Sequence, residues 1–242
     1  KYKFKIIEDA SHAFGGKYLN DPVGNCKYSD IAVFSFHPVK IITTTEGGAA
    51  VTNNTGIYAK LKALRSHGIF RNEENYSEKE KIRSSFKQKL LGFNYRMTDV
   101  QAALGISQMN KLNNFLSKRI EIKKIYDKFL NIENIIIPRI NSFSKSTFHL
   151  YVIQVKPNKI TGISRDNLLK ELKKKKISAT IHYIPIHYHP YYKKIGFKKN
   201  QFKKSEKFYD QAISLPIHPA LKISEIKYVI KIIKDYIEKK ND

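Results

Sequence analysis

Three polar side chains near the start of the chain could do chemistry together: a carboxylate, a hydroxyl and an amine. Asp9 ends one short apolar run, Ser35 ends a second, and Lys40 follows Ser35 by five residues. In an open α/β sheet, polar residues at the carboxyl ends of strands face one crevice. A lysine among apolar neighbours gives up its proton more readily and can then act as an amine nucleophile. Spacing alone also allows a structural explanation, in which Lys40 is a loop residue and Asp9 caps a helix.

The elements that would position these residues alternate between strands and helices. Compact apolar runs typical of buried strands occupy residues 4–7, 31–36 and 49–52. A helical pattern then begins at Asn53 and Asn54, with apolar side chains three to four residues apart. This alternation predicts an α/β layer.

The second half of the chain shows a different pattern. Residues 70–90 are polar and highly charged without a clear period, which predicts an exposed loop or insertion. Thr98 with Asp99 could cap a long helix that we expect to reach about Leu130. Beyond Pro138 we expect a smaller α+β arrangement, with strands at 149–155 and 177–183 and helices at 165–176 and 222–238.

These patterns predict two domains. Residues 1–115 would form the C-terminal portion of a large mixed-sheet domain, and residues 116–242 a small α+β domain, with the helix near 98–130 connecting them. The chain begins at Lys1 without an initiator methionine. We therefore expect it to be part of a longer protein.

Composition limits the classes of function. With 41% hydrophobic residues, wholesale disorder is excluded, and no apolar run reaches the roughly 18 residues that a membrane-spanning helix needs. The single cysteine, Cys26, excludes a disulfide framework and a cysteine-rich zinc site. Histidines 182, 187 and 189 have no carboxylate or cysteine at ligand spacing, so we expect no metal. A cytoplasmic protein in a reducing compartment fits this composition.

The net charge of +24 raises the alternative of a basic nucleic-acid-binding module. However, only 7 of the 45 cations are arginines, and 33 isoleucines against 12 alanines indicate an AT-rich coding bias. Lys173–Lys176 is the densest run and fits a solvated helix end. Nucleic-acid binding is therefore disfavoured, although 29 of the cations follow residue 110 and could steer an anionic substrate.

Seven short strings resemble the DegT/DnrJ/StrS family of sugar aminotransferases. They are Ile-Glu-Asp-Ala-Ser-His-Ala-Phe-Gly at 7–15, Ser-Phe-His-Pro-Val-Lys at 35–40, Glu-Gly-Gly at 46–48, Arg-Ser-His-Gly at 65–68, Leu-Gly-Phe-Asn-Tyr-Arg-Met-Thr at 91–98, Tyr-Ile-Pro at 183–185 and Ser-Leu-Pro-Ile-His-Pro at 214–219. The strings occur in the family's order and span nearly the whole chain. Thr45 departs from the pattern, since glycine or alanine would be expected before Glu46.

The resemblance implies a fold-type I enzyme that uses pyridoxal 5′-phosphate (PLP). Lys40 matches the lysine that bonds to the cofactor and moves the proton during transfer. Asp9 matches the acid that pairs with the pyridine nitrogen, where an anion keeps the ring a good electron sink. His12 matches a position beside the ring, and Ser35 a hydroxyl that binds the cofactor phosphate.

Further residues are assigned by the same resemblance. Asn94 matches an asparagine that reaches into the neighbouring subunit's site, which implies a homodimer with shared active sites. His182 and Tyr183 lie in the segment that faces the nucleotide-sugar in the family, although strand packing together with a proline-rich turn is an equal explanation for them. Family members also carry an additional N-terminal part with a phosphate loop. An inactive truncated fragment is therefore an open alternative.

The implied reaction transfers an amino group from L-glutamate to a nucleotide-linked keto-sugar for surface-glycan synthesis. The strings around Lys40 and Tyr183 look most like the transaminases of the pseudaminic acid branch. Their substrate is a UDP-4-keto-6-deoxy-N-acetylhexosamine, aminated at C4. A 3-amino-sugar transaminase of the same family is the alternative. Related dehydratases carry histidine in place of the lysine, so Lys40 argues against them.

Overall fold

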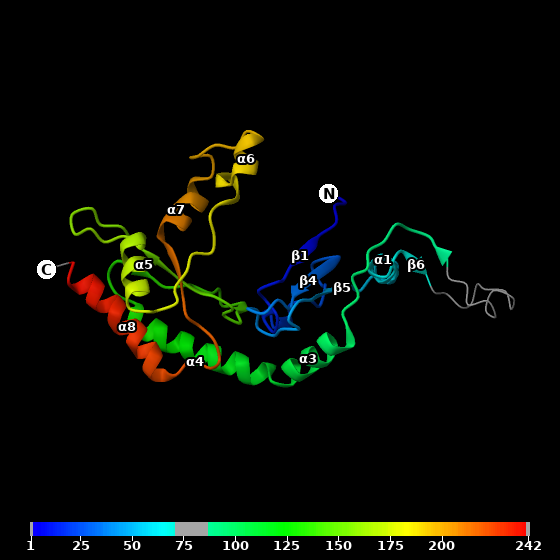
Figure 1. The fold of residues 1–242 in the computed structure, drawn as a ribbon, viewed down its shortest axis with the longest axis horizontal. Helices are drawn as coiled ribbons and strands as arrows, with labels where there is room; N and C mark the ends of the chain where they lie inside the picture. Colours follow the sequence, from blue (N-terminus) through cyan, green and yellow to red (C-terminus); the bar gives the residue numbers. More distant parts are fainter. Residues whose placement is uncertain (1, 71–86, 241–242) are drawn as a thin grey trace. The chain divides into compact units, whose positions relative to one another are not determined.

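The computed structural model describes residues 2–70 and 87–240 and is drawn in Figure 1. Contacts divide the chain into two compact units. The first comprises Lys1–Leu112 with Ser142–Thr147, and the second Asn113–Asn141 with Phe148–Asp242.

The first unit contains a three-stranded mixed sheet in the order β1-β4-β5. Strand β1 (Ile7–Asp9) pairs in parallel with β4 (Ile31–Ser35), and β5 (Gly48–Val51) runs antiparallel to β4. The predicted α/β layer is confirmed. The predicted strand at 4–7 is wrong in its bounds, because ladder pairing begins only at Ile7. Phe4 is 68% exposed, so the apolar run marks bare surface here and not buried core.

A second small sheet shows how the chain returns to this unit. Strand β2 (Lys17–Tyr18) pairs with both β3 (Asp21–Pro22) and β9 (Ser144–Lys145). Strand β9 lies more than a hundred residues after β2, so this pairing is long-range and leaves no local periodicity from which it could be predicted.

Helix α1 (Thr55–Arg65) begins directly after Asn53 and Asn54, as these two residues predict. The Asn54 side chain accepts a hydrogen bond from the Ile57 amide at 2.9 Å and caps the helix. Beyond it, β6 (Ile69–Phe70) pairs with β7 (Lys87–Gln88). The remainder of the predicted loop, residues 71–86, lies outside the described residues.

The single long helix predicted from Thr98 to Leu130 is wrong. Two helices occupy this stretch, α3 (Asp99–Asn110) and α4 (Leu112–Leu130), separated at Lys111. Thr98 forms the capping box with Gln101 that opens α3, as its side chain predicts. The break has two physical reasons. Helix α3 has no fully buried side chain, whereas α4 buries one face in the second unit. Asparagines, which have a low helix propensity, flank the junction.

The second unit is built on an antiparallel sheet in the order β11-β10-β8. Its strands are β8 (Ile135–Ile136), β10 (Tyr151–Val155) and β11 (Ala212–Leu215). Helices α5 (Arg165–Lys174) and α8 (Ile223–Glu238) pack on each other and contribute apolar side chains to the core. Helix α5 ends in the lysine run, and both helices match their predicted positions within two residues.

The predicted strand at 177–183 is wrong. Only Thr180 of this segment bridges to Ser214, while β11 takes the place beside β10. All four residues of β11 are buried, so tertiary burial favours β11 over an earlier segment that is richer in β-branched residues. Three short helices precede β11: η2 (Ile186–Tyr188), α6 (Pro190–Lys194) and α7 (Lys203–Gln211). No helix among the described residues is long and apolar enough to cross a membrane.

Candidate functional site

The carboxyl ends of β1 and β4 bring Asp9 and Ser35 to the same edge of the first unit's sheet. In the parallel register Asp9 lies opposite Val33, and the Ala10 amide donates to the Val33 carbonyl at 2.9 Å. Ser35 lies two residues farther along β4, opposite Gly48 at the start of β5. This edge is therefore lined by the polar ends of two strands and the glycine turn that begins the third.

Asp9 is held in its ionised form. Its Oδ1 accepts hydrogen bonds from the Ser11 hydroxyl at 2.6 Å and from the Ser11 amide at 3.1 Å. These two bonds hold the pKa of Asp9 below its ordinary value, and the positive charges of His12 and Lys40 act in the same direction.

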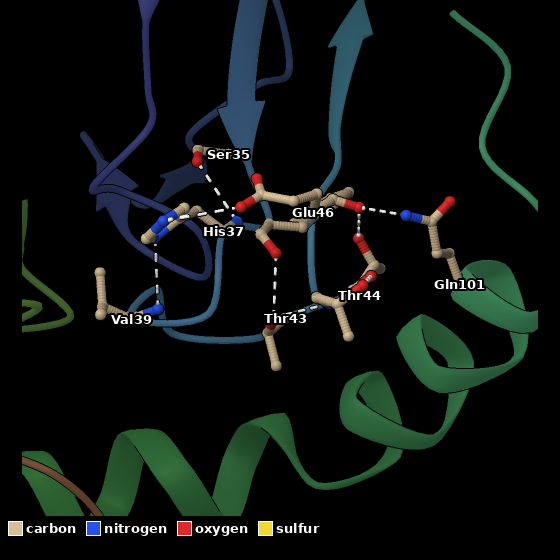
Figure 2. Close-up of polar contacts among 9 residues, drawn as sticks. Ser35, His37, Val39, Thr43, Thr44, Glu46 and Gln101 are labelled. Atoms are coloured by element: carbon tan, nitrogen blue, oxygen red, sulfur yellow. Dashed lines mark hydrogen bonds and ion pairs between the residues drawn. The ribbon is translucent and has the colours of Figure 1, made fainter.

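Lys40 lies on the loop between β4 and β5, which its own hydrogen bonds close. Figure 2 shows side-chain bonds of this loop, among them those of Thr43 and Thr44. The Phe36 amide donates to the Gly47 carbonyl at 2.8 Å, and the Thr44 amide donates to the Phe36 carbonyl at 3.0 Å. The Lys40 amide donates to the His37 carbonyl at 2.9 Å, and the chain is buried at Ile41 directly after it. The half-buried Lys40 is thus carried by a loop of defined shape.

Helix α3 supports the same loop from outside. Figure 2 shows Gln101 reaching from α3 toward Glu46, and its Nε2 donates to the Glu46 carbonyl at 2.9 Å. The Thr44 hydroxyl donates to the same carbonyl, also at 2.9 Å. Gly48 allows a close approach here, because a Cβ at this position would lie 2.6 Å from the Phe34 carbonyl oxygen.

This set of groups fits PLP. An ionised carboxylate suits a protonated pyridine nitrogen, a primary amine suits the aldehyde, and a hydroxyl suits the phosphate. Asp9, Lys40 and Ser35 supply these three groups from one edge of a sheet. His12 has an exposed side chain just beyond β1, and its carbonyl accepts a hydrogen bond from the Thr147 hydroxyl at 3.3 Å.

Asn94 lies on a separate segment of the first unit, against the last turn of α1. The Phe93 amide donates to the Leu64 carbonyl at 2.7 Å, and the Tyr95 amide to the Arg65 carbonyl at 2.9 Å. The Asn94 side chain is exposed. The structure thus presents Asn94 at the surface, and its predicted role in a neighbouring subunit's site stays a prediction.

His182 and Tyr183 lie in the second unit. The His182 Nδ1 is 2.7 Å from the Ser214 hydroxyl, and its ring meets the Tyr183 ring edge-on at 4.5 Å between centroids. Tyr183 is 71% exposed. Strand packing does not account for a side chain this exposed, but a proline-rich turn does, so the substrate role of Tyr183 stays a prediction.

Three supporting residues escaped sequence reasoning. Ser11 holds the charge of Asp9, Ser214 orients His182, and Glu206 pairs with the buried His187. Ser11 could have been found from its position two residues after an aspartate, a spacing typical of a local side-chain turn. The other two contacts join residues 32 and 19 positions apart and left no local signal. No group of three metal-ligating side chains occurs in the part of the chain that the structure describes.

Comparison with known proteins adds a family match. The model of the DegT/DnrJ/EryC1/StrS aminotransferase family matches residues 1–234. A UDP-4-amino-4,6-dideoxy-N-acetyl-beta-L-altrosamine transaminase of Campylobacter jejuni strain 81-176 is 37% identical over 240 residues, covering 99% of this chain and 60% of that protein. The Helicobacter pylori protein of the same name is 34% identical, covering 95% of this chain and 58% of its own length.

Solved structures give the same result. Helicobacter pylori PseC, an aminotransferase involved in pseudaminic acid biosynthesis, superposes with a TM-score of 0.84 at 32% identity, covering 97% of this chain and 60% of its own. The PLP form of a sugar aminotransferase from Streptococcus pneumoniae superposes with a TM-score of 0.85 at 28% identity, covering 98% and 58%. The chain spans about 60% of the length of the relatives named here.

Proposed function

Because the chain belongs to the DegT/DnrJ/EryC1/StrS aminotransferase family, we propose that the full-length protein is a PLP-dependent aminotransferase of nucleotide-linked keto-sugars. The observation that supports the proposal is that Asp9 and Ser35 end two neighbouring parallel strands at one edge of the sheet, where the loop that carries Lys40 leaves β4. The Ser11 bonds that keep Asp9 ionised support the same assignment.

The residues of this chain would divide the work as follows. When bound, PLP supplies an electron sink for the carbon that gains or loses the amino group. Asp9, ionised at neutral pH, would hold a proton on the ring nitrogen, and the Ser35 hydroxyl would donate to the phosphate. The Lys40 amine would condense with the cofactor aldehyde and release water, and after the amino donor has displaced it, the free amine would carry the proton between substrate and cofactor carbons. His12 would lie beside the ring.

For the substrate, we propose a UDP-4-keto-6-deoxy-N-acetylhexosamine aminated at C4, with L-glutamate as the donor. The transaminases of Campylobacter and Helicobacter named above support this choice at 34–37% identity. His182 and Tyr183 would contact the nucleotide-sugar. A 3-amino-sugar product is the alternative, which NMR assignment of the aminated carbon distinguishes. Such a reaction belongs in the cytoplasm, where nucleotide-sugars are made.

The proposed function is tested on Lys40 of the full-length protein. Borohydride reduction of the PLP-loaded protein, followed by peptide mapping, should place the cofactor on Lys40 and on no other lysine. Lys40→Ala should lower turnover at least about a thousandfold, since removal of a covalent catalyst costs several kcal/mol of transition-state stabilisation. Lys17→Ala, an exposed lysine on β2, is the matched control. Turnover retained by Lys40→Ala would refute the assignment.

A further inference from the structure

Glu206 is a buried carboxylate in the second unit that the proposed cofactor chemistry does not use. It is 6% exposed, and its Oε1 lies 2.8 Å from Nε2 of His187, which is also 6% exposed. A carboxylate at this depth is normally held by several donors, because burial without partners strongly disfavours its charge.

The other donors to Glu206 come from the same neighbourhood of the chain as His187. The Asn200 amide donates to Oε2 at 3.0 Å, and the Phe202 amide donates to Oε1 at 3.3 Å. The Tyr188 hydroxyl is hydrogen-bonded to this carboxylate as well. Burial raises the pKa of Glu206, but these bonds together hold it below the ordinary value. One ionised side chain therefore gathers four donors.

These donors all belong to residues 182–202, a segment named here the His182 lobe. The main apolar core of the second unit contains no residue from this lobe, in the described part of the chain. The lobe instead holds a small aromatic cluster, in which Phe202 lies 4.8 Å from the His187 ring and 6.2 Å from Phe197. The Glu206 carboxylate thus links the lobe to α7 through hydrogen bonds, beside the ring contact of Tyr188 with Tyr209 at 6.3 Å between centroids.

The start of the lobe is held by the strand that directly follows α7. Ser214 on β11 is hydrogen-bonded to His182 Nδ1 at 2.7 Å. Between the two histidine anchors, Tyr183 is 71% exposed and Ile186 64% exposed. The continuous stretch of α7 and β11 therefore contacts the lobe at His182 and His187, and the residues between these two histidines are exposed.

We propose that Glu206 is a positioning residue, which holds His187 so that the lobe presents Tyr183 to the nucleotide-sugar. This inference rests on the proposed function, in which His182 and Tyr183 contact that substrate. Glu206 itself touches neither cofactor nor sugar in this assignment. It acts through the geometry of residues 182–188.

The experiment compares Glu206→Ala, Glu206→Gln and Glu121→Ala in the full-length enzyme. Glu121 is exposed on α4 and paired with Lys118, which makes Glu121→Ala a matched control in the same unit. We expect Glu206→Ala to raise KM for the nucleotide-sugar about tenfold while the half-reaction with glutamate keeps its rate. Glu206→Gln keeps an oxygen acceptor and should recover part of that loss. An unchanged sugar KM, or equal damage to both half-reactions, would overturn the proposal.

Hydrogen exchange separates this proposal from the proposed function. In Glu206→Ala the amides of Asn200 and Phe202 should exchange faster, while those of β10 stay protected. If wild-type protein shows no transamination, the proposed function fails, and the exchange result alone decides whether Glu206 holds the lobe. If Tyr183→Ala leaves the sugar KM unchanged, the presentation of Tyr183 is refuted even where exchange is faster.

Discussion

Asp9 keeps its negative charge because Ser11 donates two hydrogen bonds to the same carboxylate oxygen. Its pKa in the folded protein lies below the ordinary 3.8. A carboxylate with a lowered pKa stabilises the fold at pH values above its unfolded pKa, and this contribution is lost as pH falls through the folded value. Asp9 is therefore mostly ionised at every pH above about 3.8. The proposed pairing with a protonated pyridine nitrogen needs this negative charge.

We expect Ser11→Ala to raise the pKa of Asp9 toward its ordinary value, because the hydrogen bond from the Ser11 hydroxyl, the largest cause of the lowered pKa, is removed. NMR titration of the Asp9 side-chain carboxyl measures this directly. Ser29→Ala is the matched control, since the Ser29 hydroxyl donates to the neighbouring carboxylate of Glu8 at 3.3 Å and not to Asp9. An unshifted titration in Ser11→Ala would show that Ser11 does not hold the charge.

Thr45 is the residue where the sequence departs from the glycine or alanine expected from the resemblance, and the backbone conformation here suits glycine. Its φ is +65°, in the left-handed region that a β-branched side chain disfavours. Thr45→Gly should raise the free energy of unfolding by about 0.5–1 kcal/mol, as measured by urea denaturation.

Thr55→Gly is the control for this substitution. Thr55 is exposed in the first turn of α1, where glycine should lower the free energy of unfolding by up to about 1 kcal/mol. The two substitutions should therefore change stability in opposite directions. A loss of stability in Thr45→Gly would mean that its strain is offset by contacts of the threonine side chain.

At the scale of elements, Asn94 is positioned by two glycines that bring backbone against backbone. A Cβ on Gly92 would overlap the amide nitrogen of Gly68 and the carbonyl carbon of His67. This close approach sets the segment 92–95 against the end of α1, where the Phe93 and Tyr95 amides find carbonyl partners. The two strings that carry these glycines therefore form one structural feature.

Gly92→Ala should lower the free energy of unfolding by about 2 kcal/mol or more, because backbone cannot move aside as a flexible side chain does. Denaturation measures the loss. Gly56→Ala provides the contrast, since its Cβ would meet only the Asn54 side chain, at 3.3 Å. That variant should be neutral or gain up to about 1 kcal/mol within α1. Equal stability of Gly92→Ala and wild type would contradict the close packing.

At the scale of the whole molecule, the predicted role of Asn94 requires a homodimer with shared sites. If Asn94 serves the partner's site, a heterodimer of Lys40→Ala and Asn94→Ala subunits contains one intact site and one doubly defective site. Mixing the two inactive variants should restore about a quarter of wild-type activity for random pairing in a twofold dimer.

Subunit exchange followed by an activity assay measures this recovery. Mixing Lys40→Ala with itself after the same treatment is the control. If Asn94 acts within its own subunit, both sites of every heterodimer stay defective and no activity returns.

The sequence alone determined the fold class, the family and the residues proposed to meet the cofactor, because these depend on local strings. Asn54 and Thr98 cap helices as their side chains predict, and α5 and α8 follow their apolar periodicity. Local chemistry and short-range spacing decide such features, so no tertiary contact was needed to find them.

Tertiary structure alone decided the features that depend on residues distant in sequence. Burial beside β10 made residues 212–215 a strand in place of residues 177–183, and the change of packing partner at Lys111 divided the long helix. The hydrogen bonds of Glu206 with His187 and of Ser214 with His182 also join segments that only folding brings together. A carboxylate or hydroxyl can hold another segment in place when its hydrogen-bond partners are distant in sequence. The spacing of residues along the chain does not show which distant residues those partners are.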